Sequence, residues 1–137
     1  MKKLILTMTL MIVVALVIAG CGGSGGGAAG PGDVARGKAL YNKSTIGTKS
    51  AEGCVACHKY DEKEGKAEKA PYTKETAKRA GTRVPGMSAE EYIKESLLSP
   101  DKYIVEGFNK GDMYQKFGAE LSAQEIADLI AYLLTEK

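Results

Sequence analysis

The sequence predicts an all-α domain of three to five helices within its 137 residues. Two segments carry apolar residues at helical spacing behind a good N-capping residue, one close to each end of the domain. No segment between them shows a convincing alternation of apolar and polar residues, which would be typical of a strand. Helices joined by long loops are therefore the expected architecture.

The first helix is expected in the segment GDVARGKALYNK, where Asp33 is a suitable N-cap residue. Its predicted contact face consists of Val34, Gly37, Leu40 and Tyr41. Glycine inside a helix costs about 1 kcal/mol relative to alanine. Close approach of a second helix at Gly37 would offset that cost, so we expect a helix crossing there.

The C-terminal helix is the expected partner in this crossing. Ser122 and Glu125 form a capping box, and Leu121 and Ile126 are placed as a hydrophobic staple. Apolar residues then recur at helical spacing at Ile126, Leu129, Ile130, Leu133 and Leu134. The pattern indicates a helix with one strongly apolar face.

Two further helices are expected between these ends. One runs from about Ala89 to Leu98, where Ser99-Pro100 ends it. Ser88 and Glu91 form its capping box. A shorter helix is possible from about Lys74 to Ala80, just before Gly81.

An export signal precedes the domain. Lys2 and Lys3 are followed by an apolar run from Leu4 to Ala19, which is slightly short for a membrane span of about 20 residues. The sequence IAGC, ending at Cys21, resembles the lipobox of bacterial lipoproteins, in which the cysteine is acylated and becomes the N-terminus. An uncleaved anchor or ordinary secretion are the alternatives, and all three place the domain outside the cytoplasmic membrane.

The expected organisation is a signal peptide at 1–20, a lipidated tether at 21–32 and the folded domain at 33–137. The Gly/Ser-rich tether cannot form a core and should reach about 18 Å as a flexible coil. The chain has 19 basic and 17 acidic residues, and removal of Lys2 and Lys3 leaves 17 of each. Such a neutral domain lacks the basic excess expected for nucleic-acid binding.

The segment EGCVACHKY contains two of the three cysteines and the only histidine of the chain. If Cys21 is lipidated, Cys54, Cys57 and His58 remain as a C-x-x-C-H motif, which is the signature of c-type haem attachment. The two thiols add to the vinyl groups of the porphyrin, and the histidine supplies the proximal nitrogen to iron. We therefore expect one covalent haem c.

Three other uses of these residues are less well supported. A thioredoxin-like C-x-x-C needs a βαβ setting, which the sequence does not indicate. A structural zinc site needs four ligands, whereas only Cys54, Cys57 and His58 are obvious candidates. A simple disulfide would leave His58 without a role.

The sixth iron ligand is expected to be a methionine, and the mature chain has only Met87 and Met113. Met87 precedes a capping box and faces Tyr92 as a hydrophobic staple, which gives it a structural role. Met113 lies in a glycine-bounded loop, EGFNKGDMYQKFG, without helical or strand period. We assign Met113 as the distal ligand; Met87, an open iron, or lysine or tyrosine ligation are the alternatives.

The chain resembles class I cytochromes c from about Gly32 to Lys137. GDVxxGKxxY matches the N-terminal helix of that family, CVACH its haem site and ADLIAYL its C-terminal helix. The resemblance implies the class I cytochrome c fold, in which the N- and C-terminal helices cross beside one covalently attached haem. It also implies that Pro71 offers its carbonyl to the second ring nitrogen of His58, fixing the tautomer.

The resemblance further implies that Arg79 lies near a haem propionate, with Arg83 as a rival. Three features depart from the family pattern. The loop between Tyr41 and Cys54 is longer than in the mitochondrial type, Tyr114 stands where many bacterial members carry proline, and the chain has no tryptophan.

The expected function is that of a membrane-tethered monohaem electron carrier, monomeric and not itself an enzyme. It would shuttle single electrons between respiratory or photosynthetic redox proteins, facing the periplasm or the cell exterior. Charge complementarity would raise the rate of encounter with an acidic partner. The candidate lysines around the haem edge are Lys43, Lys49, Lys59, Lys110 and Lys116. A haem-based sensor of CO or NO and a fixed subunit of a larger oxidoreductase are the alternatives.

Overall fold

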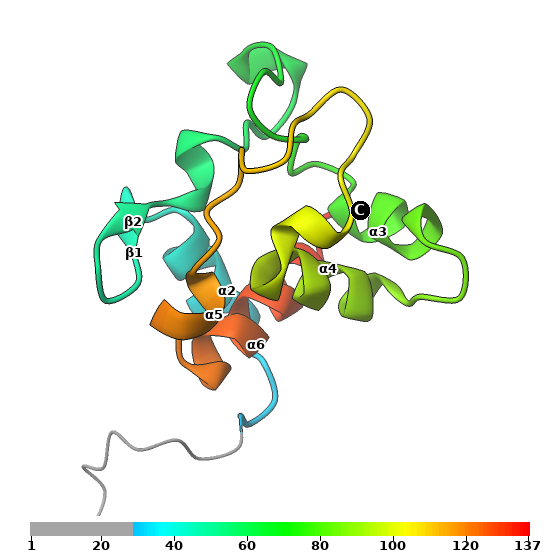
Figure 1. The fold of residues 1–137 in the computed structure, drawn as a ribbon. Helices are drawn as coiled ribbons and strands as arrows, with labels where there is room; N and C mark the ends of the chain where they lie inside the picture. The colour runs from blue at the N-terminus through cyan, green and yellow to red at the C-terminus, as the bar shows by residue number, and fades with distance from the viewer. Residues whose placement is uncertain (1–28) are drawn as a thin grey trace, which may run out of the picture.

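Five α-helices and one short hairpin make up residues 29–137, the part of the chain that this computed structural model describes (Figure 1). The helices are α2 (Val34–Tyr41), α3 (Thr76–Arg83), α4 (Ala89–Leu98), α5 (Phe117–Glu120) and α6 (Ala123–Leu133). Short 3₁₀ helices are η1 (Cys54–Ala56), η2 (Glu62–Glu64) and η3 (Pro100–Lys102). The predicted all-α fold is confirmed. The predicted signal at 1–20 and lipidation at Cys21 lie outside the described residues.

Helices α2 and α6 cross with their backbones in direct contact. A Cβ atom on Gly37 would lie 1.9 Å from the carbonyl oxygen of Asp128, so no side chain fits there. The rings of Tyr41 and Tyr132 pack beside this crossing, with centroids 5.3 Å apart. The expected crossing at Gly37 is therefore present. Val34 does not belong to its contact face, because its side chain is 44% exposed.

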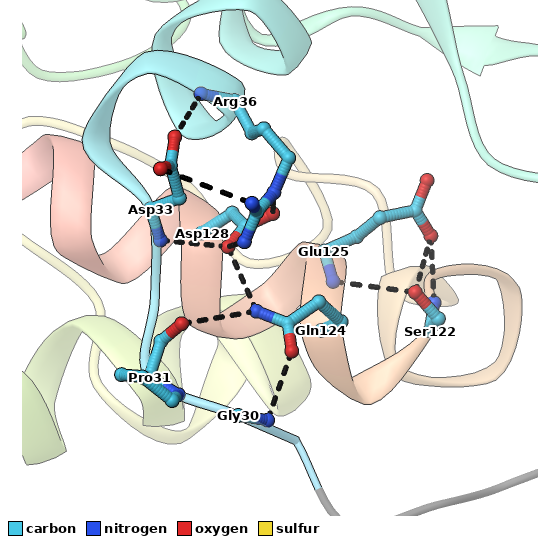
Figure 2. Close-up of polar contacts among 8 residues, drawn as sticks. All are labelled: Gly30, Pro31, Asp33, Arg36, Ser122, Gln124, Glu125 and Asp128. Atoms are coloured by element: carbon cyan, nitrogen blue, oxygen red, sulfur yellow. Dashed lines mark hydrogen bonds and ion pairs between the residues drawn. The ribbon is translucent and has the colours of Figure 1, made fainter.

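A buried carboxylate, Asp128, joins the start of α2 to α6 (Figure 2). Arg36 donates two hydrogen bonds to it, from Nε at 2.7 Å and from Nη2 at 2.9 Å. The backbone N–H of Asp33 and the side-chain amide of Gln124 donate at 2.8 and 2.9 Å. These donors, Arg36 above all, hold the pKa of Asp128 well below its usual value.

The last residues of the predicted tether are fixed to α6 rather than free. Gln124 Oε1 accepts a hydrogen bond from the N–H of Gly30 at 2.9 Å, and Gln124 Nε2 donates to the carbonyl of Pro31 at 3.2 Å (Figure 2). A Cβ atom on Gly32 would lie 2.1 Å from the carbonyl oxygen of Ala127. The glycine-rich composition therefore serves close contact at this end of the tether.

The helix caps follow the sequence. Asp33 caps α2, and both predicted capping boxes are present, Ser88 with Glu91 on α4 and Ser122 with Glu125 on α6. The helix predicted from about Lys74 to Ala80 is present but shifted along the chain, because α3 begins at Thr76 and continues through Gly81. Its end is set instead by the extended conformation of Val84, the conformation favoured for a residue that precedes proline.

Two elements were not predicted. An antiparallel hairpin of β1 (Thr45–Ile46) and β2 (Ala51–Glu52) occupies the long loop before the C-x-x-C-H motif. Helix α5 has only four residues. Elements this short are smaller than the window in which a periodic pattern can be detected. None of the helices in residues 29–137 is long and apolar enough to cross a membrane.

Replacing Gly37 with alanine should destabilise the domain by about 3 kcal/mol, because the new Cβ would force the α2–α6 backbones apart. Gly81→Ala is the matched control: the new Cβ makes an ordinary 3.7 Å contact, so higher helix propensity should make it neutral or stabilising. Urea unfolding of the haem-loaded proteins measures both. Equal effects of the two substitutions would contradict the crossing.

Asp128→Asn should lower the free energy of unfolding at pH 7 by about 2 kcal/mol, because Arg36 loses a charged hydrogen-bond partner. The folded pKa of Asp128 is depressed, so its contribution is full above the unfolded pKa of about 3.9 and is lost as the pH falls further. The difference between the two proteins should therefore shrink at pH 3. Urea unfolding at both pH values, with the exposed Glu62→Gln as control, tests this; a pH-independent difference would refute it.

Candidate haem site

One cavity of about 470 Å³ brings together the residues singled out in the sequence. It lies between the turn after β2, helices α3 and α4, and the loop that leads into α5. Its apolar wall includes Ile93 and Leu97 of α4, Phe117 of α5 and Leu129 of α6. The predicted site residues that line it are Cys54, Cys57, His58, Pro71, Arg79, Arg83 and Met113.

The C-x-x-C-H motif begins in the 3₁₀ turn η1 and closes with an α-type turn at His58. The N–H of His58 donates to the carbonyl of Cys54 at 2.9 Å, and both cysteines and the histidine line one cavity. Gly53 packs closely against the chain just after α2, since a Cβ there would lie 1.8 Å from the carbonyl oxygen of Lys43. The compact spacing of the motif is thus realised as one tight turn.

Cys54 and Cys57 are not joined to each other by a disulfide. Burial raises the pKa of the Cys54 thiol to about 11, so this group is protonated at neutral pH. Reactive cysteines of redox enzymes have a depressed pKa instead. The environment of Cys54 therefore does not match a thioredoxin-like function.

His58 is held by one hydrogen bond to the backbone. Its Nδ1 lies 2.8 Å from the carbonyl oxygen of Pro71, so Nδ1 carries the proton and Nε2 is left with a free lone pair. Burial lowers the pKa of His58, which keeps the imidazole neutral. A neutral, oriented imidazole with a free Nε2 has the state required of a metal ligand.

Thr73 fixes the segment that carries Pro71, a role that the sequence analysis missed. The N–H of Thr73 donates to the carbonyl of Lys59 at 2.9 Å, directly after the haem-attachment motif. Its hydroxyl pairs with the hydroxyl of Tyr41 at 2.5 Å, and its side chain is only 2% exposed. No local pattern marks such a residue, because its partners are distant in sequence.

Both predicted arginines reach the cavity. Arg79 donates to the carbonyls of Tyr72 and Lys74, and burial lowers its pKa. Arg83 donates to the Tyr92 hydroxyl at 3.2 Å and lies 5.6 Å over the Tyr92 ring. Two guanidinium groups at one cavity suit an anionic substituent.

The two methionines occupy different sites. Met113 lines the same cavity as the attachment motif, although the two are far apart in the sequence. Met87 lines a separate shallow groove beside Glu91 and Leu98 of α4, and is partly buried against the core. Met113 as distal ligand stays a prediction, and only this methionine shares a cavity with His58.

Asp101 organises the loop that carries Met113 (yellow to orange in Figure 1). Its Oδ1 accepts hydrogen bonds from the N–H of Gly111 at 2.8 Å and from the Gln115 amide at 3.1 Å. Gln115 in turn donates to the carbonyl of Met113 at 2.7 Å. Asp101 lies in an unremarkable polar segment, so the sequence offered no signal for this contact.

The donors present fit a haem better than a bare metal ion. In residues 29–137 no group of three or more histidine, cysteine or acidic side chains could hold a metal. Haem iron already has four porphyrin nitrogens and needs only axial donors, which His58 and Met113 can supply. Cys54 and Cys57 stand on the same turn as His58, as two thioether bonds to one porphyrin require.

Comparison with known proteins gives the same answer for the folded domain. A family model described as Cytochrome c matches residues 34–137, which is most of the chain. A search of curated proteins finds no match. Members of the matched family carry covalently bound haem c and transfer electrons through it. This protein belongs to the cytochrome c family.

Proposed function

We propose that this protein is a membrane-tethered carrier with a single haem c, which shuttles single electrons between redox proteins outside the cytoplasmic membrane. Family membership establishes haem-based electron transfer in general. One observation carries the finer proposal: Cys54, Cys57, His58 and Met113 line the same cavity. The count of one haem rests on the single C-x-x-C-H motif and the single histidine of the chain.

The chain's own residues provide the environment for axial ligation by histidine and methionine. When bound, the haem supplies a one-electron iron couple. His58 is kept neutral and oriented by Pro71, while Gln115 and Asp101 hold the backbone at Met113. Methionine as the second axial ligand raises the reduction potential. The apolar side chains of Ile93, Leu97 and Phe117 line one wall of the cavity, which suits the apolar ring of a porphyrin.

The proposed role includes no catalytic activity of the chain itself. His58 is its only histidine, and as an axial ligand it cannot serve as a catalytic acid or base. We therefore propose a carrier and not an enzyme, acting as a monomeric domain. Its donor and acceptor are proposed to be redox proteins.

The tether completes the proposal. The lipobox-like IAGC would place a lipid on Cys21, at the beginning of the glycine-rich segment. That segment meets the folded domain at Gly30, where Gln124 holds it on α6. The domain would therefore hang from the membrane through a short linker attached at one defined point. Periplasmic or cell-exterior exposure follows from export.

Met113→Ala should keep the haem attached but lower its reduction potential by a few tenths of a volt, within the range of about 0.8 V that axial ligands span. Met87→Ala is the matched control, because Met87 lies outside the cavity. Redox titration followed by absorption measures both potentials. A large shift in Met87→Ala with none in Met113→Ala would reverse the ligand assignment.

Cys21→Ser should release a haem-containing protein from the membrane fraction, because serine cannot accept the thioether-linked lipid. The unaltered protein should stay with the membranes and need detergent for extraction. Fractionation of cells followed by haem staining measures the distribution. An unaltered protein that is already soluble, or one whose mass shows no lipid on Cys21, would contradict lipid tethering.

A further inference from the structure

Glu120, the last residue of α5, is a carboxylate buried beside the loop that carries Met113. It is only 6% exposed, and a buried charge is costly unless hydrogen bonds compensate for lost hydration. Each of its oxygens has one donor. The Tyr114 hydroxyl donates to Oε1, and the N–H of Lys49 donates to Oε2 at 3.3 Å.

Tyr114 directly follows Met113, so a contact of its side chain also restrains the peptide that carries Met113. Its ring packs edge-on against Phe117, with centroids 5.1 Å apart and planes at 65°. Its hydroxyl is held by Glu120. Ring and hydroxyl are thus fixed to the same short helix, α5, at two different points.

The hairpin turn closes over the other side of the Glu120 carboxylate. Gly47 in that turn has φ +78°, and a Cβ added to it would lie 2.7 Å from Glu120 Oε2. The turn therefore packs closely against the carboxylate, where only glycine fits. Residues from three separate segments, the hairpin, α5 and the Met113 loop, meet at this one side chain.

We infer that Tyr114 and Glu120 are positioning residues that hold Met113 at the iron. This inference rests on the proposed histidine–methionine ligation. A ligand held in place rebinds faster than any competitor from solution, because its effective concentration is high. Weakening the restraint should therefore let an external ligand displace Met113 more easily, without loss of the haem.

The restraint through Tyr114 is one of two on Met113. Gln115 also donates to the Met113 carbonyl and is itself bonded to Asp101. Loss of the Tyr114 hydroxyl alone should therefore loosen the methionine and not release it. The expected effect is a moderate shift in ligand exchange.

Tyr114→Phe tests this inference, since phenylalanine keeps the ring against Phe117 and removes only the hydroxyl. The haem-loaded ferric protein is titrated with imidazole, and loss of the red absorption band of the methionine–iron bond is followed. The affinity for imidazole should rise about fivefold to tenfold, the effect of one lost hydrogen bond. Tyr60→Phe is the matched control, because Tyr60 is 42% exposed and lies outside the cavity; it should bind imidazole like the unaltered protein.

Glu120→Gln is the second variant, because it keeps an acceptor oxygen and removes the charge. Neutral hydrogen bonds are about half as strong as charged ones, so its increase in imidazole affinity should stay within about threefold. An affinity in Tyr114→Phe within about twofold of the unaltered protein would overturn the inference, even if the melting temperature falls. A missing methionine band in the unaltered protein would overturn the proposed ligation together with the inference, so the two failures are distinguishable.

Discussion

The cavity between the C-x-x-C-H turn and the Met113 loop is the constraint on which the rest of the structure depends. Its lining combines apolar side chains of α4, α5 and α6 with the attachment motif and Met113, and protein interiors are close-packed. A covalently attached haem would fill this space and bury those apolar side chains, so it would be part of the fold as well as the functional group.

The scaffold around the cavity consists of the crossing of helices α2 and α6 and of loops that polar contacts hold in place. Helices α2 and α6 meet backbone to backbone at Gly37, and Asp128 clasps the two beside that contact. The proposed axial ligands, His58 and Met113, lie outside the α-helices, where a side chain has no regular hydrogen-bond ladder to hold it. Each loop is instead fixed by its own polar contacts: Pro71 on His58, and Gln115 on the backbone of Met113. Such contacts can keep ligand geometry constant between two oxidation states.

Local chemistry decides which features the sequence could predict. Both capping boxes and the crossing glycine were predictable, because each depends on residues within one turn or on the absence of a side chain. The two-residue strands and α5 are too short to carry a period. Thr73 bonds to Tyr41, 32 residues away, and Glu120 bonds to the N–H of Lys49, 71 residues away, which no local rule detects. Two of the three departures noted in the sequence, the long loop and Tyr114, meet at Glu120.

The proposed protein has a single porphyrin bonded through thioethers to Cys54 and Cys57. Mass spectrometry of the denatured protein, purified from cells able to attach c-type haem, tests it most directly. The expected result is a coloured polypeptide whose mass exceeds that of the processed chain and its lipid by one haem. Neither cysteine thiol should react with an alkylating reagent. A colourless polypeptide in which Cys54 and Cys57 are both alkylated would contradict it.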